Sequence, residues 1–161
     1  GRVKNHLPST KFAVVGRKLE TDPGYWDHVQ QLTEQLGLKQ DVVFTGFCED
    51  IPAVLSALDV FVLASIEESC PVALLEAMAM KVPVVATNVG AVSEMVDHGR
   101  TGFVVPPGDA GAIAEAVLAI LSKPRDEVRN MVEEARKTVE QKFAIDTIAR
   151  QQKEIYECLS G

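Results

Sequence analysis

Short, continuously apolar runs alternate with helical segments along this chain, and this alternation constrains the fold more than any other feature. The apolar runs occupy residues 12–16, 42–46, 60–65, 82–87 and 102–105. Apolar runs of this length without polar alternation are typical of parallel strands that are covered on both faces. Because segments with helical periodicity lie between them, the pattern indicates repeated βαβ units. We therefore predict an α/β fold, a Rossmann-like open parallel sheet flanked by helices.

This architecture predicts where a ligand would bind. In open parallel sheets, ligands bind beyond the carboxyl ends of the strands. The residues that end the five predicted strands are Val15, Thr45, Ala64, Thr87 and Val105. We therefore expect the functional residues in the loops that follow them.

Composition excludes several other classes of protein. With 161 residues, 47% of them apolar and 24% charged, the chain has enough material for one packed globular domain. No apolar run approaches the roughly 18 residues of a membrane helix. The 16 basic and 23 acidic residues give a net charge of −7, and the basic residues form no cluster. We therefore do not expect the chain to bind nucleic acid.

The cysteines and histidines do not predict a metal site or a disulfide framework. The spacing of these residues lacks the paired ligand pattern of zinc sites. The three cysteines cannot all be paired in disulfides within the chain, because their number is odd. Reduced thiols favour a cytoplasmic protein. The residues concerned are Cys48, Cys70, Cys158, His6, His28 and His98.

A largely apolar helix is predicted to follow the third strand. Proline is favoured at the first position of a helix, so we expect the helix to begin at about Pro71. Glu76 is the one polar side chain between Pro71 and Met80. A helix that is apolar on nearly all sides is usually buried, which predicts a buried Glu76 carboxylate that needs a partner. That partner is either a local backbone or basic group, or a ligand.

The position of this helix favours a ligand. Its free N–H groups and positive dipole end suit an anion such as a diphosphate. Glu68 lies just before the helix and Glu76 lies within it. Carboxylates accept hydrogen bonds from hydroxyls, so two of them flanking a diphosphate suit a nucleotide sugar. For Glu68 and its neighbour Glu67, a solvated acidic loop is the alternative.

The loop after the fourth strand is expected at the same edge. Gly90 would permit a close backbone approach, and a short helix is predicted to begin near Ser93. We therefore include Gly90 among the candidate donor-binding residues. The alternative is that Gly90 is an ordinary turn residue.

These segments resemble a known family. The sequence ESCPVALLEAMA at 68–79 is similar to the E-x7-E signature of retaining glycosyltransferases of the GT-B fold, glycosyltransferase family four (glycosyl transferases group 1). The segments LGLKQDVVFTGF at 36–47, LDVFVLAS at 58–65 and VPVVATNVGAVSEMVDHGRTGFVVPPGD at 82–109 also resemble this family. The resemblance implies the C-terminal, donor-binding half of a GT-B enzyme.

The resemblance also implies roles for individual residues. Glu68 would be the catalytic-site residue that contacts the donor sugar, and Glu76 would bond the ribose hydroxyls. Main-chain groups before and at the start of the helix would lie near the sugar and diphosphate, and the loop around two further residues would surround the base. The main-chain groups belong to Ser69, Cys70, Pro71 and Val72, and the base loop is Gly46 and Phe47.

The implied reaction transfers a hexose from a UDP-, GDP- or ADP-sugar to a hydroxyl of a glycan or lipid acceptor, with retention of configuration. The sequence has no D-x-D motif, so we expect neither a metal nor a cofactor. Helix dipoles and cations would then stabilise the leaving group.

The chain departs from the family pattern in several places. Ser69 and Cys70 replace an aromatic residue and a glycine, and Ala91 replaces a glycine. The family's Arg and Lys from an earlier strand and helix would precede residue 1, and Arg17 and Lys18 match a different loop. We therefore expect 1–161 to be an N-terminally incomplete donor-binding domain. Its C-terminal helix, 144–161, would pack toward an N-terminal acceptor domain.

Three further expectations follow from this domain assignment. The chain alone should be inactive, because chemistry in a GT-B enzyme takes place between its two halves. The full-length enzyme is expected in the cytoplasm, with peripheral attachment to the cytoplasmic membrane surface left open. The nucleotide base, the sugar and the acceptor also stay open.

Other functions are compatible with parts of the pattern. A sugar-nucleotide 2-epimerase-like isomerase would also bind a nucleotide sugar, but would need no acceptor. A non-catalytic nucleotide-binding relative would keep Glu68 and Glu76. A receiver-like signalling domain needs an aspartate after the third strand, where this chain has Ala64 and Ser65.

Overall fold

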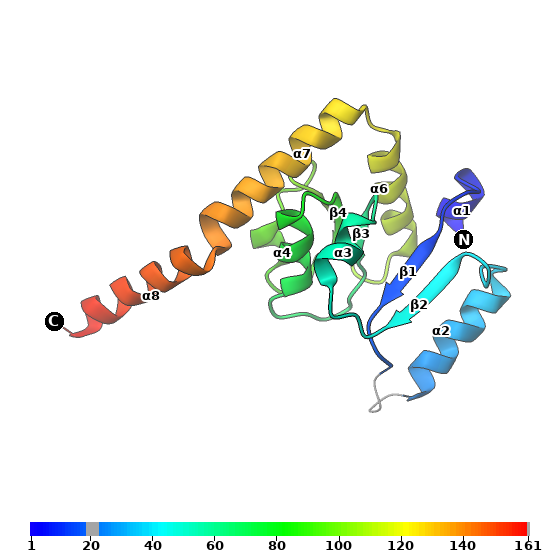
Figure 1. Cartoon of the computed structure of the whole chain (residues 1–161), viewed down its shortest axis with the longest axis horizontal. Helices are drawn as coiled ribbons and strands as arrows, with labels where there is room; N and C mark the ends of the chain where they lie inside the picture. The colour runs from blue at the N-terminus through cyan, green and yellow to red at the C-terminus, as the bar shows by residue number, and fades with distance from the viewer. Residues whose placement is uncertain (19–22, 161) are drawn as a thin grey trace. The chain divides into compact units, whose positions relative to one another are not determined.

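The computed structural model describes residues 1–18 and 23–160, which form two compact units, Gly1–Val54 and Leu55–Gly161 (Figure 1). All strand pairs in the described residues are parallel, as predicted. Their hydrogen bonds define a two-stranded sheet, β1-β2, and a three-stranded sheet, β3-β4-β5. The prediction of one donor-binding domain over 1–161 stays a prediction.

The first unit is a small parallel pair with its helices. Its elements are α1 (Arg2–His6), β1 (Phe12–Val15), α2 (Pro23–Gln35), β2 (Val42–Gly46) and the start of α3 (Ile51–Ser56). Phe12 pairs with Val42 at the start of the two strands. Trp26 of α2 packs edge-on against Phe44 of β2, with ring centroids 5.1 Å apart, and so fixes the helix on one face of the pair.

A carboxylate with two cations joins α1 to the beginning of this sheet. The Nζ atoms of Lys4 and Lys11 each lie 2.7 Å from Oδ1 of Asp41, the residue before β2. The hydrogen bonds from these ammonium groups lower the pKa of Asp41 below its ordinary value. The carboxylate therefore stays ionised and paired at neutral pH.

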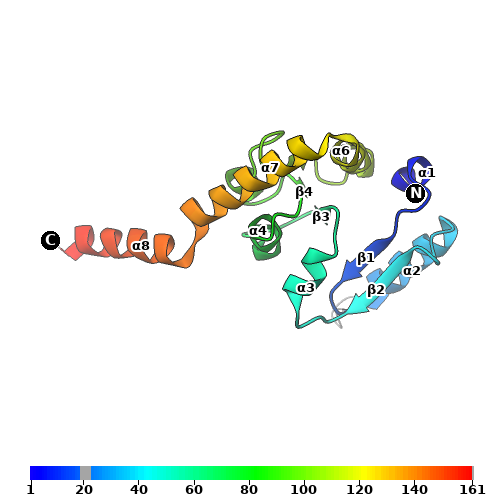
Figure 2. The same cartoon turned by 45° about the horizontal axis from the view of Figure 1, so that its top comes forward.

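The second unit contains the better-covered sheet. Its elements are β3 (Phe61–Leu63), α4 (Val72–Ala79), β4 (Val84–Thr87), α5 (Val92–Met95), β5 (Phe103–Val105), α6 (Ala110–Ser122), α7 (Arg125–Thr138), the π-helical turn η1 (Val139–Phe143) and α8 (Ile145–Ser160). Figures 1 and 2 show α4 and α6 on opposite sides of β4. The core includes the fully buried Leu74, Met78, Val85 and Ile120.

The expectation of strands covered on both faces is correct for β4, wrong for β1, β2 and β3, and met in part by β5, whose residues are buried or half-buried. Every residue of β4 is buried. By contrast, β1, β2 and β3 each contain exposed residues, and Val43 of β2 is 58% exposed. The difference follows from position, because β4 is the central strand of three and has helices on both sides.

The last helix, α8, carries an apolar stripe that is exposed. It continues from α7 through η1 and extends away from the three-stranded sheet (Figures 1 and 2). The stripe consists of Ile145, Ile148, Ile155 and Leu159. Their spacing places them along one side of the helix. Across the described residues, no helix is both long and apolar enough to span a bilayer.

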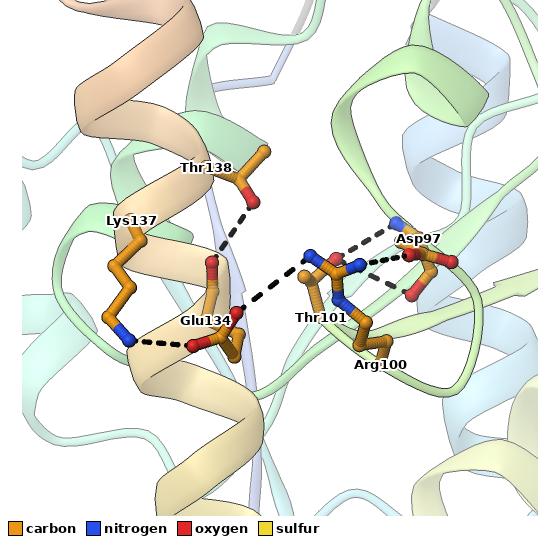
Figure 3. Close-up of polar contacts among 6 residues, drawn as sticks. All are labelled: Asp97, Arg100, Thr101, Glu134, Lys137 and Thr138. Carbon is orange, nitrogen blue, oxygen red and sulfur yellow. Dashed lines mark hydrogen bonds and ion pairs between the residues drawn. The ribbon is translucent and has the colours of Figure 1, made fainter.

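A polar network links the loop before β5 to α7 (Figure 3). Arg100 lies 3.3 Å from the Asp97 carboxylate and 3.8 Å from that of Glu134 on α7. Exposed ion pairs of this kind contribute little stability. The buried member is Thr101, whose Oγ1 accepts a 2.8 Å hydrogen bond from the main-chain N–H of Asp97.

We predict that Thr101→Val lowers the free energy of unfolding by about 1–2 kcal/mol, because valine keeps the shape and leaves the Asp97 N–H without its acceptor. Urea denaturation followed by far-UV circular dichroism measures this change. Thr138→Val is the matched control. Its hydroxyl donates to the Glu134 carbonyl within α7, and its loss should change stability by less than about 0.5 kcal/mol. Equal effects of the two substitutions would contradict this account.

Candidate functional site

The predicted site residues are divided between the two units. In the first unit, Gly46 ends β2 and Phe47 follows it, and the other candidates lie in the second unit. At the end of β2, the Gly16 N–H donates a 3.0 Å hydrogen bond to the Gly46 carbonyl. The Arg17 guanidinium lies 5.1 Å from the centroid of the Phe47 ring, which is 64% exposed. This end of the sheet therefore presents an aromatic ring beside a cation.

In the second unit, the loop between β3 and α4 holds Glu68. The Ser65 hydroxyl donates a 2.8 Å hydrogen bond to Oε1 of Glu68. The hydroxyl of Thr87, the last residue of β4, donates a 2.6 Å hydrogen bond to the Ser65 carbonyl. Thr87 is fully buried. The Glu68 side chain is thus connected to the central strand through two hydrogen bonds.

Gly90 packs against the same loop. Its φ is +52°, and a Cβ atom there would lie 2.3 Å from the Glu68 carbonyl oxygen and 2.7 Å from that of Ser69. The Ala91 N–H donates a 3.0 Å hydrogen bond to the Ser69 carbonyl. The close backbone approach expected at Gly90 therefore exists, and it is made to the chain's own Glu68 loop.

The helix after this loop begins one residue later than predicted. Val72 is the first residue of α4, and Pro71 is its buried N-cap. The first N–H groups of a helix have no partner within the helix, and they carry the positive end of its dipole. Cys70, immediately before Pro71, is an exposed free thiol.

The prediction that Glu76 is buried is wrong. α4 buries Leu74, Ala77 and Met78, and it leaves Glu76 exposed on the same side as the 61% exposed Val72. Because the apolar content of the helix extends onto its outer side, composition alone suggested full burial. Among residues 1–18 and 23–160, none forms a hydrogen bond or ion pair with the Glu76 carboxylate. It is therefore available to a ligand.

The sequence reasoning missed two residues of this site, Ser65 and Thr87. Both are hydroxyl residues at the carboxyl side of apolar strands, which was the available signal. Their importance depends on the pairing of β3 beside β4, because that pairing brings the two strand ends together.

The site has no metal-binding cluster in the part of the chain that the structure describes. A separate cavity of about 470 Å³ lies elsewhere in the second unit, and no predicted site residue lines it. Its charged lining is mixed. It is formed by residues of both signs, Glu94, Asp97, Arg100 and Lys142. This cavity therefore does not favour an anionic ligand.

Proteins that are similar to this chain in sequence include named glycosyltransferases. The N-acetyl-alpha-D-glucosaminyl L-malate synthase of Bacillus anthracis is 35% identical over 128 residues, which cover 80% of this chain and 33% of that protein. The putative colanic acid biosynthesis glycosyltransferase WcaL of Escherichia coli strain K12 is 36% identical over 137 residues, or 80% of this chain and 34% of that protein. The chain thus spans about a third of the length of these relatives.

The fold also matches a solved structure. The crystal structure of Anabaena Alr3699/HepE in complex with UDP and glucose has a TM-score of 0.89 and 29% identity, over 99% of this chain and 43% of that one. The predicted fold, the Rossmann-like C-terminal half of a GT-B fold, is confirmed. The family model of glycosyl transferases group 1 matches residues 1–123. This chain therefore belongs to the glycosyl transferases group 1 family.

Proposed function

We propose that this chain is the donor-binding domain of a retaining hexosyltransferase that transfers a sugar from a nucleoside diphosphate to an acceptor hydroxyl. The observation that carries the proposal is the pair of carboxylates around the start of α4. Glu68 is held by Ser65 before the helix, and Glu76 stands exposed within it. A solved relative contains UDP and glucose, which supports a nucleotide sugar as the ligand.

The start of α4 suits the diphosphate of such a donor. Main-chain groups of Ser69, Cys70, Pro71 and Val72 border the helix N-terminus, where N–H groups and the dipole favour negative charge. These N–H groups and the helix dipole would also stabilise the negative charge that develops on the leaving diphosphate. We propose that transfer needs no metal, because this electrostatic contribution comes from the protein.

The two carboxylates then contact hydroxyls on either side of the diphosphate. Glu68 accepts hydrogen bonds from the hexose, and Glu76 accepts them from the ribose. A hydrogen bond to an ionised carboxylate is roughly twice as strong as a neutral one, which suits recognition of polyols. We also propose, as the family resemblance implies, that Gly46 and Phe47 contact the base; the exposed Phe47 ring offers a stacking surface.

The other proposed partners are an acceptor glycan or lipid and an N-terminal acceptor domain. We propose that the apolar stripe of α8 packs toward that domain, because four exposed apolar side chains along one helix favour a protein partner. The free thiols support a cytoplasmic location of the enzyme.

Glu76→Ala is predicted to weaken binding of the cognate nucleoside diphosphate about tenfold, because a ribose hydroxyl loses its charged acceptor. Amide NMR titrations with UDP, GDP and ADP identify the base through shifts at Gly46, Cys70 and Gly90. Glu115→Ala is the matched control, since Glu115 is an exposed helical glutamate of α6. It should leave binding unchanged.

A second ligand separates ribose recognition from a general loss of affinity. The 2′,3′-dideoxy form of the same nucleotide should bind the wild-type chain about tenfold more weakly than the ribonucleotide. Glu76→Ala should bind the two nucleotides with equal affinity. Equal discrimination by both proteins would overturn the role of Glu76. A wild-type chain that binds no nucleotide at millimolar concentration would overturn the proposed function.

Gly90→Ala is predicted to weaken binding of the nucleotide sugar more than tenfold and to destabilise the chain by about 1–3 kcal/mol. The new Cβ would overlap the carbonyl oxygens of Glu68 and Ser69, so the loop must move. Isothermal titration and urea denaturation measure the two effects. Gly99→Ala is the control, because Gly99 also has a positive φ of +80° but faces open space. If the two variants bind equally well, the loop is not part of the site.

We also predict that this chain alone transfers no sugar, because the chemistry of the proposed reaction requires an acceptor-binding domain. Incubation with a radiolabelled donor and candidate acceptors, followed by chromatography of the products, tests this expectation. Acceptor-dependent transfer by the purified chain would contradict it.

A further inference from the structure

Two hydroxyl side chains form a hydrogen-bonded path from the core of the second unit to the Glu68 carboxylate. The path starts at Thr87, which is fully buried at the end of the central strand. Its hydroxyl donates to the Ser65 carbonyl at 2.6 Å, and the Ser65 hydroxyl donates to Oε1 of Glu68 at 2.8 Å. The two bonds therefore link a rigid strand to a half-buried carboxylate in a loop.

We propose that Ser65, held in place by Thr87, is a positioning residue that orients Glu68 toward the donor sugar. This inference rests on the proposed function. It assigns to Ser65 and Thr87 a role in sugar recognition that is separate from nucleotide binding.

The geometry leaves one carboxylate oxygen for the ligand. Ser65 has a single hydroxyl proton and donates it to Oε1, so Oε2 of Glu68 keeps its lone pairs for sugar hydroxyls. Held by this bond, the carboxylate loses less side-chain freedom when a ligand binds. The adjacent Glu67 is exposed, and across the described ranges no hydrogen bond orients its carboxylate. The loop therefore fixes one of its two glutamates.

The path also fixes the serine itself. The Thr87 hydroxyl has one proton, and its nearer acceptor is the Ser65 carbonyl rather than that of Leu63, which is 3.4 Å away. Ser65 lies beyond the end of β3, where the strand ladder no longer holds the backbone. A side-chain bond from β4 replaces the missing ladder bond at this point. Packing of Gly90 on Glu68 and Ser69 holds the other side of the loop.

A positioning role predicts a selective effect on sugar recognition. Ser65→Ala should weaken binding of the nucleotide sugar about tenfold and leave binding of the nucleoside diphosphate unchanged within about twofold, since only the sugar contacts Glu68. Ser65→Thr keeps the hydroxyl and should restore binding of the nucleotide sugar. Isothermal titration measures both ligands for each protein, using the pairs UDP and UDP-glucose, GDP and GDP-mannose, and ADP and ADP-glucose.

Two further variants complete the test, one as a control and one as a second break in the path. Ser122→Ala removes a serine hydroxyl bonded to a main-chain carbonyl at the end of α6, and it should leave both ligands unaffected. Thr87→Val keeps the buried volume and breaks the bond to Ser65. It should show the same selectivity as Ser65→Ala, with a smaller loss. Far-UV circular dichroism confirms that each variant is folded.

The outcomes separate this inference from the proposed function. Equal weakening of both ligands in Ser65→Ala, or no change in either, would overturn the positioning role, while nucleotide binding by the wild-type chain would still support the proposed function. Failure of Ser65→Thr to restore sugar binding would also overturn it. If the wild-type chain binds none of the three pairs, the proposed function fails and the role of Ser65 fails with it.

Discussion

The contact between Gly90 and the carbonyls of Glu68 and Ser69 is the constraint on which the candidate site depends. The two loops that follow the neighbouring parallel strands β3 and β4 are in contact there through their main chains, and no side chain fits between them. The Ala91 N–H closes the contact with a hydrogen bond to Ser69. Because the partners are backbone atoms, they cannot move aside as a flexible side chain could. The position of Glu68 is therefore set by the strand pairing beneath it.

The burial of β4 gives this junction its rigidity. The strand is enclosed on both sides by helices. Thr87 at its end holds the loop after β3 through the hydrogen bond to the Ser65 carbonyl. The exposed site residues are thus attached to the least exposed part of the second unit. A loop tied in this way can present a carboxylate in one orientation, which reduces the entropy lost on binding.

Much of the fold could be predicted from the sequence, and the candidate site could be predicted in part. The apolar runs located the five strands of the described residues, and Pro71 located the start of α4 to within one residue. The spacing of Glu68 and Glu76 identified the candidate carboxylates. Their surroundings were less predictable, because the composition of α4 suggested burial for Glu76. Which side of a helix faces solvent depends on the elements that pack against it.

What the sequence determined by itself is local: strand and helix identity, the parallel arrangement that βαβ alternation requires, and the family signature around α4. What only the tertiary structure decided is which groups touch. Glu76 is accessible because α4 buries Leu74, Ala77 and Met78 instead. Ser65 contacts Glu68 and Thr87 because β3 pairs with β4. Such contacts depend on distances across the chain, and residue order carries no direct record of them.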